Sequence, residues 1–325
     1  MLFLLPFVYS SCGGDEPDNG ESNMTDVAVT GSVSNIGSMH AQISGVVNLE
    51  IITAAYTNVE IGIEYSTVET FQDKQRIVSN SLTGRSFSIQ LWALHPETKY
   101  YYRTFVNVSS LSYDYYGETR AFSTKKTTEK DMYIDLGLPS GTLWATINVG
   151  ASAPDESGSY FAWGEIAPKG YYSWSSYKWR NGSGGTMTKY CTNSSDGTVD
   201  NKTELDPEDD AAYMNWGPSW RMPTSEQMYE LYDKCTWTWT TLLYGVAGQL
   251  VTGPNGNSIF LPAAGYRWDE SLFEVSRGFY WTRTLGSEDS RWALILEHTR
   301  KDIRYYNAYY RFVGCSVRPV RVSQN

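Results

Sequence analysis

Residues 25 to 124 contain short runs rich in β-branched and aromatic residues, and turn residues separate each run from the next. The runs are VAVTGSVSNIG, HAQISGVVNL, VEIGIEYS, RSFSIQLWAL, KYYYRTFVNV and GETRAFST. Several of them alternate in polarity, and no helical period competes with that alternation. The segment is therefore predicted to fold as an antiparallel β-sandwich.

The stretch LHPETKYYYRTFV is the most specific part of this segment. Leu94, Pro96, Thr98 and Tyr100 alternate along it. Strand alternation would turn Tyr100 and Tyr102 to one face of the sheet. The spacing resembles the L-x-P-x-T-x-Y tyrosine corner of fibronectin type III domains, in which the tyrosine hydroxyl bonds an upstream backbone group. That resemblance implies a spacer without chemistry of its own.

At 325 residues the chain exceeds one typical domain, so we expect a mainly β two-domain protein. The polar stretch KKTTEK, residues 125–130, is the predicted linker, and residues 131–322 form the predicted second domain. Of the 12 tryptophans, all but Trp92 follow that linker. The balance of 36 acidic against 26 basic residues argues against nucleic acid or an anionic membrane surface as the main partner.

The first 24 residues are predicted to be a signal remnant and a tether. The stretch MLFLLPFVYSSCGGDEPDNGES begins apolar, but its apolar run is too short to span a bilayer as a helix. It resembles the end of a bacterial lipoprotein signal peptide, with Cys12 as the acylated residue, and the acidic, glycine-rich stretch that follows is typical of a flexible tether. The resemblance implies an outer-membrane protein displayed on the cell surface, in contact with the membrane only through its lipid anchor.

Residues 131–322 combine strand-like pieces with a short helical region. Asp206 is a candidate N-cap with Pro207 at the first helical position. A second helix is expected at Thr224, because Gln227 three residues later completes a capping box. The later pieces SIFLPAAGYR, GFYWTRT, RWALILE, IRYYNAYYR and GCSVRPV are predicted strands.

A series of blocks in this segment resembles a known family. The blocks are YIDLGLPSGTLWATINVGA, FAWGE, LDPEDDAAYMNWG, WRMPTSEQMYEL, NSIFLPAAGYR, YWTRT and GCSVRPV. Their order closely resembles the FISUMP family, the "major paralogous domain" of bacterial surface lipoproteins. The resemblance implies an α+β, C-type-lectin-like fold and a cell-surface or fimbrial context, without a common set of catalytic residues.

The fragment Arg221-Met222-Pro223-Thr224 is similar to the R-L-P-T helix start of formylglycine-generating enzymes. Those enzymes depend on reactive late cysteines, and here Cys315 alone is late. Its expected role is a packed strand residue or a disulfide partner of Cys191 or Cys235. We therefore expect no enzyme, and a shared helix entry explains the fragment.

Acidic residues crowd the predicted helix start, and carboxylates are the ligands that calcium prefers. The candidate metal ligands are Asp206, Glu208, Asp209 and Asp210. They miss the EF-hand spacing, and a solvated helix start is the favoured interpretation. No cofactor other than such a calcium ion is expected. Paired carboxylates for glycan cleavage remain an alternative, although nothing selects a pair.

Aromatic residues late in the chain form a predicted contact set, because Tyr and Trp bring large contact area at low entropic cost. Its members are Tyr305, Tyr306, Asn307, Tyr309, Tyr310, Arg311, Trp268 and Trp292. Alternation would place Tyr305, Asn307 and Tyr309 on one strand face. The opposing interpretation is that these rings fill a core, which we favour for Trp144, Trp163, Trp216, Trp220 and Trp281.

Together these patterns predict a lipid-anchored surface protein that binds a glycan or a protein partner, in an adhesive, fimbria-like setting. Three alternatives stay open: a formylglycine-generating type of enzyme, a glycan-cleaving enzyme, and a purely structural assembly subunit.

Overall fold

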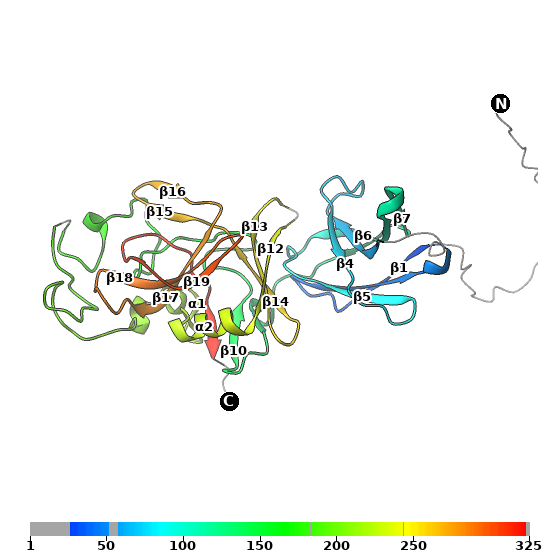
Figure 1. The fold of residues 1–325 in the computed structure, drawn as a ribbon. Helices are drawn as coiled ribbons and strands as arrows, with labels where there is room; N and C mark the ends of the chain where they lie inside the picture. Colours follow the sequence, from blue (N-terminus) through cyan, green and yellow to red (C-terminus); the bar gives the residue numbers. More distant parts are fainter. Residues whose placement is uncertain (1–26, 52–57, 183, 243, 323–325) are drawn as a thin grey trace, which may run out of the picture.

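The computed structural model describes residues 27–51, 58–182, 184–242 and 244–322 (Figure 1). The predicted lipid attachment residue, Cys12, lies outside these ranges. The described fold is mainly β, with several separate sheets. None of its helices is long and apolar enough to cross a membrane.

Residues 27–124 form two antiparallel sheets. The first has the order β1-β2-β5, with β1 at Ala28–Ser34, β2 at Ala41–Val47 and β5 at Ser86–Leu91. The second has the order β4-β3-β6-β7, and β8 also pairs with β6. Its strands are β3 (Val59–Ser66), β4 (Gln75–Val78), β6 (Lys99–Val108), β7 (Tyr113–Tyr116) and β8 (Arg120–Ser123). Two 3-10 turns, η1 (Leu49–Ile51) and η2 (Ser109–Leu111), join strands.

The predicted tyrosine corner is present. The backbone N–H of His95 donates to the Tyr100 hydroxyl over 2.8 Å. Tyr100 and Tyr102 are both buried in the hydrophobic cluster that the two sheets enclose, as the strand alternation predicts. The strand order and this corner define a fibronectin type III-like fold for this part of the chain.

The predicted linker is tied by hydrogen bonds. The N–H of Lys125 donates to the carbonyl of Gly37 over 3.0 Å. The 3-10 turn η3 (Glu129–Met132) begins inside the predicted linker, where Thr128 and Asp131 form a capping box. Nearby, His95 contacts the C-terminal part of the chain, with its ring 3.9 Å from that of Tyr244.

Residues 131–322 carry four further groups of strands. The first strand, β9, and the last, β20, both pair with β10, in the order β11-β20-β10-β9, so the two ends of this part lie in one sheet. These strands are β9 (Tyr133–Asp135), β10 (Thr142–Ala145), β11 (Trp220–Arg221) and β20 (Val320–Val322). The second sheet holds β12 (Thr236–Thr241), β13 (Ala247–Thr252) and β14 (Ser258–Pro262), and β15 (Tyr266–Trp268) pairs with β16 (Ser271–Phe273). The last sheet holds β17 (Gly278–Leu285), β18 (Trp292–His298) and β19 (Ile303–Tyr310).

The helix predicted at Thr224 is confirmed as α2 (Ser225–Lys234). The Thr224 hydroxyl accepts from the N–H of Gln227 over 3.2 Å, and the Gln227 side chain accepts from the N–H of Thr224 over 3.0 Å. Its apolar face is buried through Met228 and Leu231, which pack in one cluster with Trp144. Local spacing was sufficient to place this helix, because both capping bonds lie within one turn.

The helix predicted at Asp206 starts later. Asp206 precedes only a 3-10 turn, η5 (Pro207–Asp209), and its side chain makes no capping bond. The α-helix α1 (Ala211–Trp216) is capped instead by Asp210, whose carboxylate accepts from the N–H groups of Ala212 and Tyr213. Asp209 and Asp210 are buried, so the interpretation of a solvated helix start is wrong for both.

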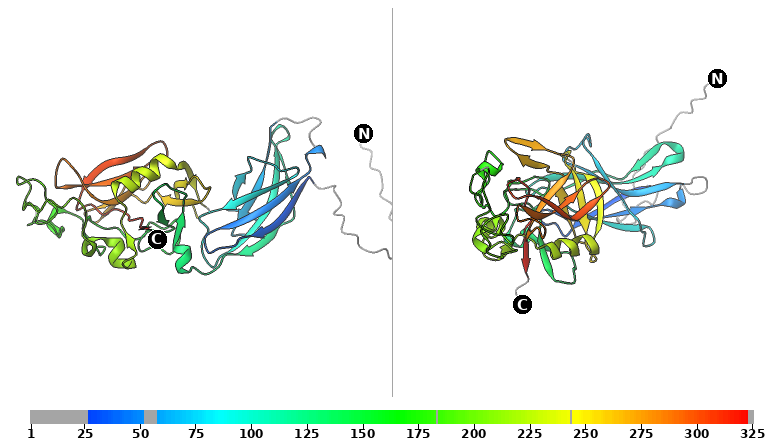
Figure 2. Two further views of the ribbon diagram at one scale, coloured as in Figure 1. Left: turned by 90° about the horizontal axis from the view of Figure 1, so that it is seen from below. Right: turned by 60° about the vertical axis from the view of Figure 1, so that its left-hand side comes forward.

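Tryptophans fill the core of the C-terminal part where the sequence favoured it. Trp144, Trp163 and Trp281 are fully buried, and Trp220 nearly so. Trp216 is half-buried and packs against the hydrophobic cluster that contains Trp163 and Trp281. Between β10 and η5 the chain runs mostly as irregular loops, with one 3-10 turn, η4 (Trp174–Ser176). The later part of these loops, around η4 and green in Figures 1 and 2, lies at the end of the molecule away from β1–β8, whereas the earlier part reaches His95 through Asp155.

Candidate functional site

Tyr310, at the end of β19, is the centre of a cluster of aromatic rings. The centroid of its ring lies 4.1 Å from that of Trp292, 5.6 Å from Trp174 and 6.2 Å from Trp268. The buried ring of Phe312 stacks on Tyr310 at 5.7 Å and completes this "Tyr310 cluster". The rings of Trp174, Trp268, Trp292 and Tyr310 are half-buried, so the cluster has one packed side and one side open to solvent.

Distant parts of the chain supply these rings. Trp292 and Tyr310 face each other across the β18–β19 ladder, Trp268 ends β15, and Trp174 begins η4. The structure thus brings together three members of the predicted contact set, Trp268, Trp292 and Tyr310. It adds Trp174, which the sequence reasoning missed, although the aromatic run YYSWSSYKW around it was a usable signal.

An open groove of about 700 Å³ adjoins the cluster at Trp292. Its lining consists of Gly286, Ser287, Glu288, Asp289, Trp292, Leu294, Asn307 and Ala308. The loop that forms one wall is closed by backbone bonds, from the N–H of Gly286 to the carbonyl of Trp292 and from the N–H of Trp292 to the carbonyl of Asp289. These two backbone hydrogen bonds therefore fix the conformation of this wall.

The polar side chains of the groove differ in whether they already have a partner within the protein. Arg291 donates from Nε to both carboxylate oxygens of Asp289 over 2.9 Å, and this bonding lowers the pKa of the Asp289 carboxyl. Glu288 is exposed and enters no ion pair among the described residues. Asn307 donates its amide to the buried carboxylate of Glu297. The groove thus offers oxygen acceptors beside an aromatic ring.

Arg311 belongs to the core, so its assignment to the contact set is wrong. The side chain is fully buried beneath the ring of Trp163. Its Nε donates to the Tyr177 hydroxyl over 2.8 Å, and the other donors reach the backbone carbonyls of Lys189, Tyr190 and Ser290. Four of the five guanidinium donors are thus occupied, and complete burial keeps the side chain from a ligand.

The remaining members of the predicted set lie in three surroundings. Tyr309 packs against Phe279 and Tyr266, with ring centroids 5.3 and 5.5 Å away. Tyr305 packs instead on α2, 4.9 Å from the ring of Tyr229. Tyr306 lies in β19, but its predicted contact role falls outside what the structure describes.

The expected alternation along β19 fails at a register shift. Ile295 pairs with Asn307, whereas Glu297 pairs with Arg304, so the ladder is irregular between these pairs. An extra residue in one strand turns the following side chains to the opposite face. Tyr305 is therefore separated from Asn307 and Tyr309, with which simple alternation grouped it.

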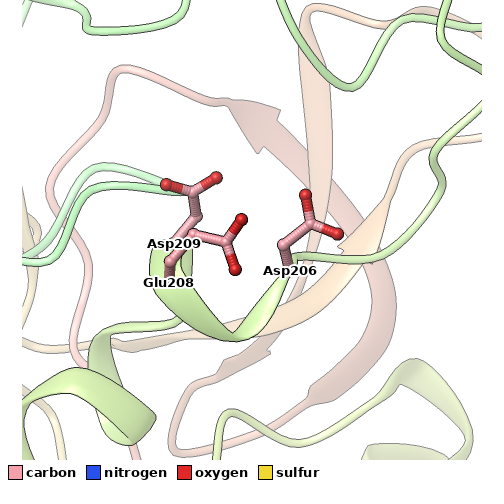
Figure 3. A group of neighbouring side chains, drawn as sticks. All are labelled: Asp206, Glu208 and Asp209. Atoms are coloured by element: carbon pink, nitrogen blue, oxygen red, sulfur yellow. The ribbon is translucent and has the colours of Figure 1, made fainter.

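The predicted metal ligands Asp206, Glu208 and Asp209 do lie together, and their side chains project to the same side of η5 (Figure 3). The ammonium group of Lys189 lies among them, 2.6 Å from an oxygen of both Asp206 and Asp209 and 3.8 Å from Glu208. Lys178 also pairs with Asp209 over 3.0 Å. A cation is thus already supplied by the chain.

The electrostatics agree with an ion-pair network. Burial acts to raise the pKa of the Asp209 carboxyl, but hydrogen bonds from Lys189, Tyr190 and Lys178 outweigh it, and the pKa is lowered. In the fourth predicted ligand, Asp210, the carboxylate oxygens accept hydrogen bonds from backbone N–H groups, including that of Met222. Calcium requires six to eight oxygen ligands and no competing ammonium group, so this donor set does not fit a calcium site.

The described cysteines, Cys191, Cys235 and Cys315, are all free thiols, so neither predicted disulfide forms. Cys315 and Cys191 are buried in the main cluster of the C-terminal part, so Cys315 is a packed core residue. The strand predicted over GCSVRPV is wrong, because Cys315 makes only an isolated bridge with Phe161 and β20 begins at Val320. Burial raises the pKa of the Cys315 thiol well above its ordinary value. A thiol in such surroundings is a poor nucleophile, because the thiolate is the reactive form.

Comparisons with known proteins add little beyond the fold. No family model matches the chain, and no curated protein does. The predicted FISUMP resemblance therefore receives no support from them. Among solved structures, a short form of the sensor domain of the anti-sigma factor RsgI4 from Pseudobacteroides cellulosolvens is 19% identical, covering 33% of this chain and 100% of that one, with a TM-score of 0.25.

Two human fibronectin type III domains are similar in the same weak sense. The domain derived from the KIAA0970 protein is 14% identical and covers 35% of this chain and 89% of that one, with a TM-score of 0.24. The 6th domain of the fibronectin type III domain containing protein 3 is 20% identical and covers 37% and 95%, with a TM-score of 0.23. The fibronectin-like assignment rests on the strand order and the tyrosine corner instead.

Proposed function

We propose that this chain is a glycan-binding protein of the bacterial cell surface, anchored in the outer membrane by a lipid on Cys12. In this proposal residues 25–124 are a spacer domain and residues 131–322 are a C-type-lectin-like domain of the FISUMP kind. It binds without catalysis, and neither nucleic acid nor a metal ion takes part. The observation that carries the proposal is the half-open Tyr310 cluster with its adjoining groove.

Sugars have the chemistry that such a surface recognises. One face of a sugar ring carries C–H groups that pack on aromatic rings, and its hydroxyl groups donate to carboxylates and amides. Trp292 provides a ring at the edge of the groove, and Glu288 and Asp289 provide oxygen acceptors within it. The volume of about 700 Å³ falls inside the usual range of about 300–1,000 Å³ for ligand sites.

The position of the site in the molecule supports display. Trp174 belongs to the loop region that lies at the far end from the N-terminal sheets (Figure 2). A tether at the N-terminus would therefore leave the fibronectin-like part between the membrane and the binding surface. That is the arrangement in which a spacer is useful.

One observation favours a second candidate, an assembly role through protein contacts. Tyr229 and Tyr232 of α2 are 40% and 37% exposed and pack with Tyr305, with Tyr232 and Tyr305 ring centroids 4.5 Å apart. Tyrosine is enriched in protein interfaces. This patch lies on α2 and β19, apart from the Tyr310 cluster, so the two candidates can be tested separately.

A glycan array probed with the purified chain, with and without calcium, tests the main proposal. We expect saccharide binding that survives chelation and that falls at least 10-fold in Trp292→Ala, because the sugar loses its aromatic platform. Trp239→Ala, which removes another half-buried tryptophan of a strand away from the cluster, is the matched control. An equal loss of glycan affinity in both variants, or no binding to any glycan, would contradict the proposal. Either result would then favour the assembly role through the patch on α2.

A further inference from the structure

Arg180, in the loop after η4, carries a guanidinium group without a partner. Its Nε is buried and has no hydrogen-bond acceptor, and no ion pair of this side chain occurs within the described part of the chain. The side chain is nevertheless half-buried and held in place, because its Cζ lies 4.3 Å from the centre of the Trp174 ring. The backbone of Arg180 is fixed by a bridge to Met187.

Arg311 is a stacked arginine whose guanidinium group the fold supplies with acceptors. It also stacks on a tryptophan, with its Cζ 4.8 Å from the centre of the Trp163 ring. Yet its Nε reaches the Tyr177 hydroxyl, and its other nitrogens reach three backbone carbonyls. Arg180 has no equivalent acceptors, although the chain contains more acidic residues (36), which could have paired with it, than basic ones (26). Its terminal nitrogens are not buried as Nε is and have no acceptor in the described structure, so they remain open to an acceptor from outside.

The unpaired group stands beside the candidate site. The Trp174 ring that it covers is the ring that packs on Tyr310 at 5.6 Å and on Phe312 at 4.7 Å. Burial lowers the pKa of Arg180, and the positive charge of Arg291 adds to that effect. Two guanidinium groups thus flank the Tyr310 cluster, and of these Arg291 is neutralised by Asp289. This side of the cluster has an excess of positive charge.

We propose that Arg180 binds the carboxylate of an acidic sugar whose ring, or a neighbouring ring of the same glycan, packs on the Tyr310 cluster. The inference rests on the proposed glycan-binding function and names its ligand class, a glycan that contains uronic or sialic acid. Guanidinium and carboxylate match in a planar, two-bond geometry, which a lysine cannot reproduce. The carboxylate would bind the two terminal nitrogens, which are not buried as Nε is.

The distribution of charge around the cluster also sets the orientation of the bound glycan. Glu288 is exposed in the groove on the other side of Trp292 and would repel a second acidic group. The acidic sugar therefore lies toward Trp174 and Arg180, and neutral sugars occupy the groove lined by Ser287 and Asn307. A uniformly charged glycan should bind less well than one with a single acidic residue.

The test compares acidic oligosaccharides with their methyl esters, which keep every ring and hydroxyl but lose the charge. The probes are galacturonate, glucuronate and sialic acid oligosaccharides with their ester pairs, sulfated oligosaccharides, and neutral glycans, measured by calorimetry on the full purified chain. We expect at least one acid to bind 10-fold or more tightly than its ester. That preference should disappear in Arg180→Gln, shrink in Arg180→Lys, and weaken at high salt because the pair is partly exposed.

Arg304→Gln is the control for charge, since Arg304 is an exposed, ion-paired arginine of β19. It should keep the preference, and melting curves of both Gln variants should stay close to that of the native chain, because Arg180 loses no protein hydrogen bond. Equal binding of acids and esters, or binding of neutral glycans alone, overturns the inference and leaves the proposed function standing. A preference for sulfate over carboxylate overturns the ligand class, and absence of any glycan binding overturns both proposals.

Discussion

His298, the last residue of β18, should make the stability of this protein fall as the pH drops below 7. The imidazole is fully buried, and within the described structure neither ring nitrogen makes a hydrogen bond of good geometry, although the Pro262 carbonyl lies near the ring. It packs beside the Tyr280 ring, 5.7 Å between centroids, and against Gly278, where an added Cβ would collide with its Nε2. Burial lowers the pKa of His298 to about 3; the Pro262 carbonyl acts against burial, and the charge of Arg318 acts with it.

The sign follows from proton counting. Between pH 6.5 and pH 3 the unfolded chain binds a proton at this histidine and the folded chain does not, so acid favours unfolding. With an unfolded pKa of about 6.5, the free energy of unfolding should drop by about 2 kcal/mol between pH 7 and pH 5 from this group alone. For a unit of this size that is roughly 4–8 °C in melting temperature.

The assay is thermal or urea unfolding of the native chain and of His298→Leu at pH 7, 6 and 5. Leucine has a similar volume and no ring nitrogens, so the variant should lose about 2 kcal/mol less than the native chain over this range. His40 and His95 are present in both proteins, and their contributions cancel in the difference. Equal pH dependence of the two proteins would refute the reasoning, because it would mean that His298 is protonated in the folded state.

Three further predictions concern other buried polar groups. Tyr100→Phe removes the acceptor of the half-buried His95 N–H and should lower the unfolding free energy by about 1 kcal/mol in urea titration; an unchanged midpoint would contradict the role of the tyrosine corner. In the native chain Ellman's reagent should modify Cys235, which is half-buried, well before Cys315, and early reaction at Cys315 would contradict its burial. Lys189→Met removes one cation shared by Asp206 and Asp209, which keep Lys202 and Lys178 as partners, and should cost about 1.5–3 kcal/mol, whereas calcium should not raise the melting temperature of the native chain. A calcium-dependent rise would revive the metal site.

Features that depend on neighbours in sequence were accessible without a structure. The six runs between residues 25 and 124 became strands, and the capping box of Thr224 opened a helix. The hydroxyl of Tyr100 met the backbone at the expected corner. In each case the interacting groups lie within a few residues or follow a simple period, so the pattern itself contains the geometry.

Other features were decided by the tertiary structure. Nothing near Arg311 in the sequence supplies the carbonyls of Lys189, Tyr190 and Ser290 that bury it, so it looked like part of a surface run. Asp210 displaced Asp206 as the helix cap because the N–H of Met222, further along the chain, also bonds its carboxylate. The fold, through contacts between distant segments, determined which polar groups are satisfied internally.

The candidate site divides in the same way. Sequence composition alone identified Trp268, Trp292 and Tyr310 as aromatic residues suited to recognition. Only the folded chain placed Trp174 beside them and left Arg180 without an acceptor. Residue type sets what a side chain is able to bind, whereas burial and partners, which are properties of the whole fold, set what it still has free to offer.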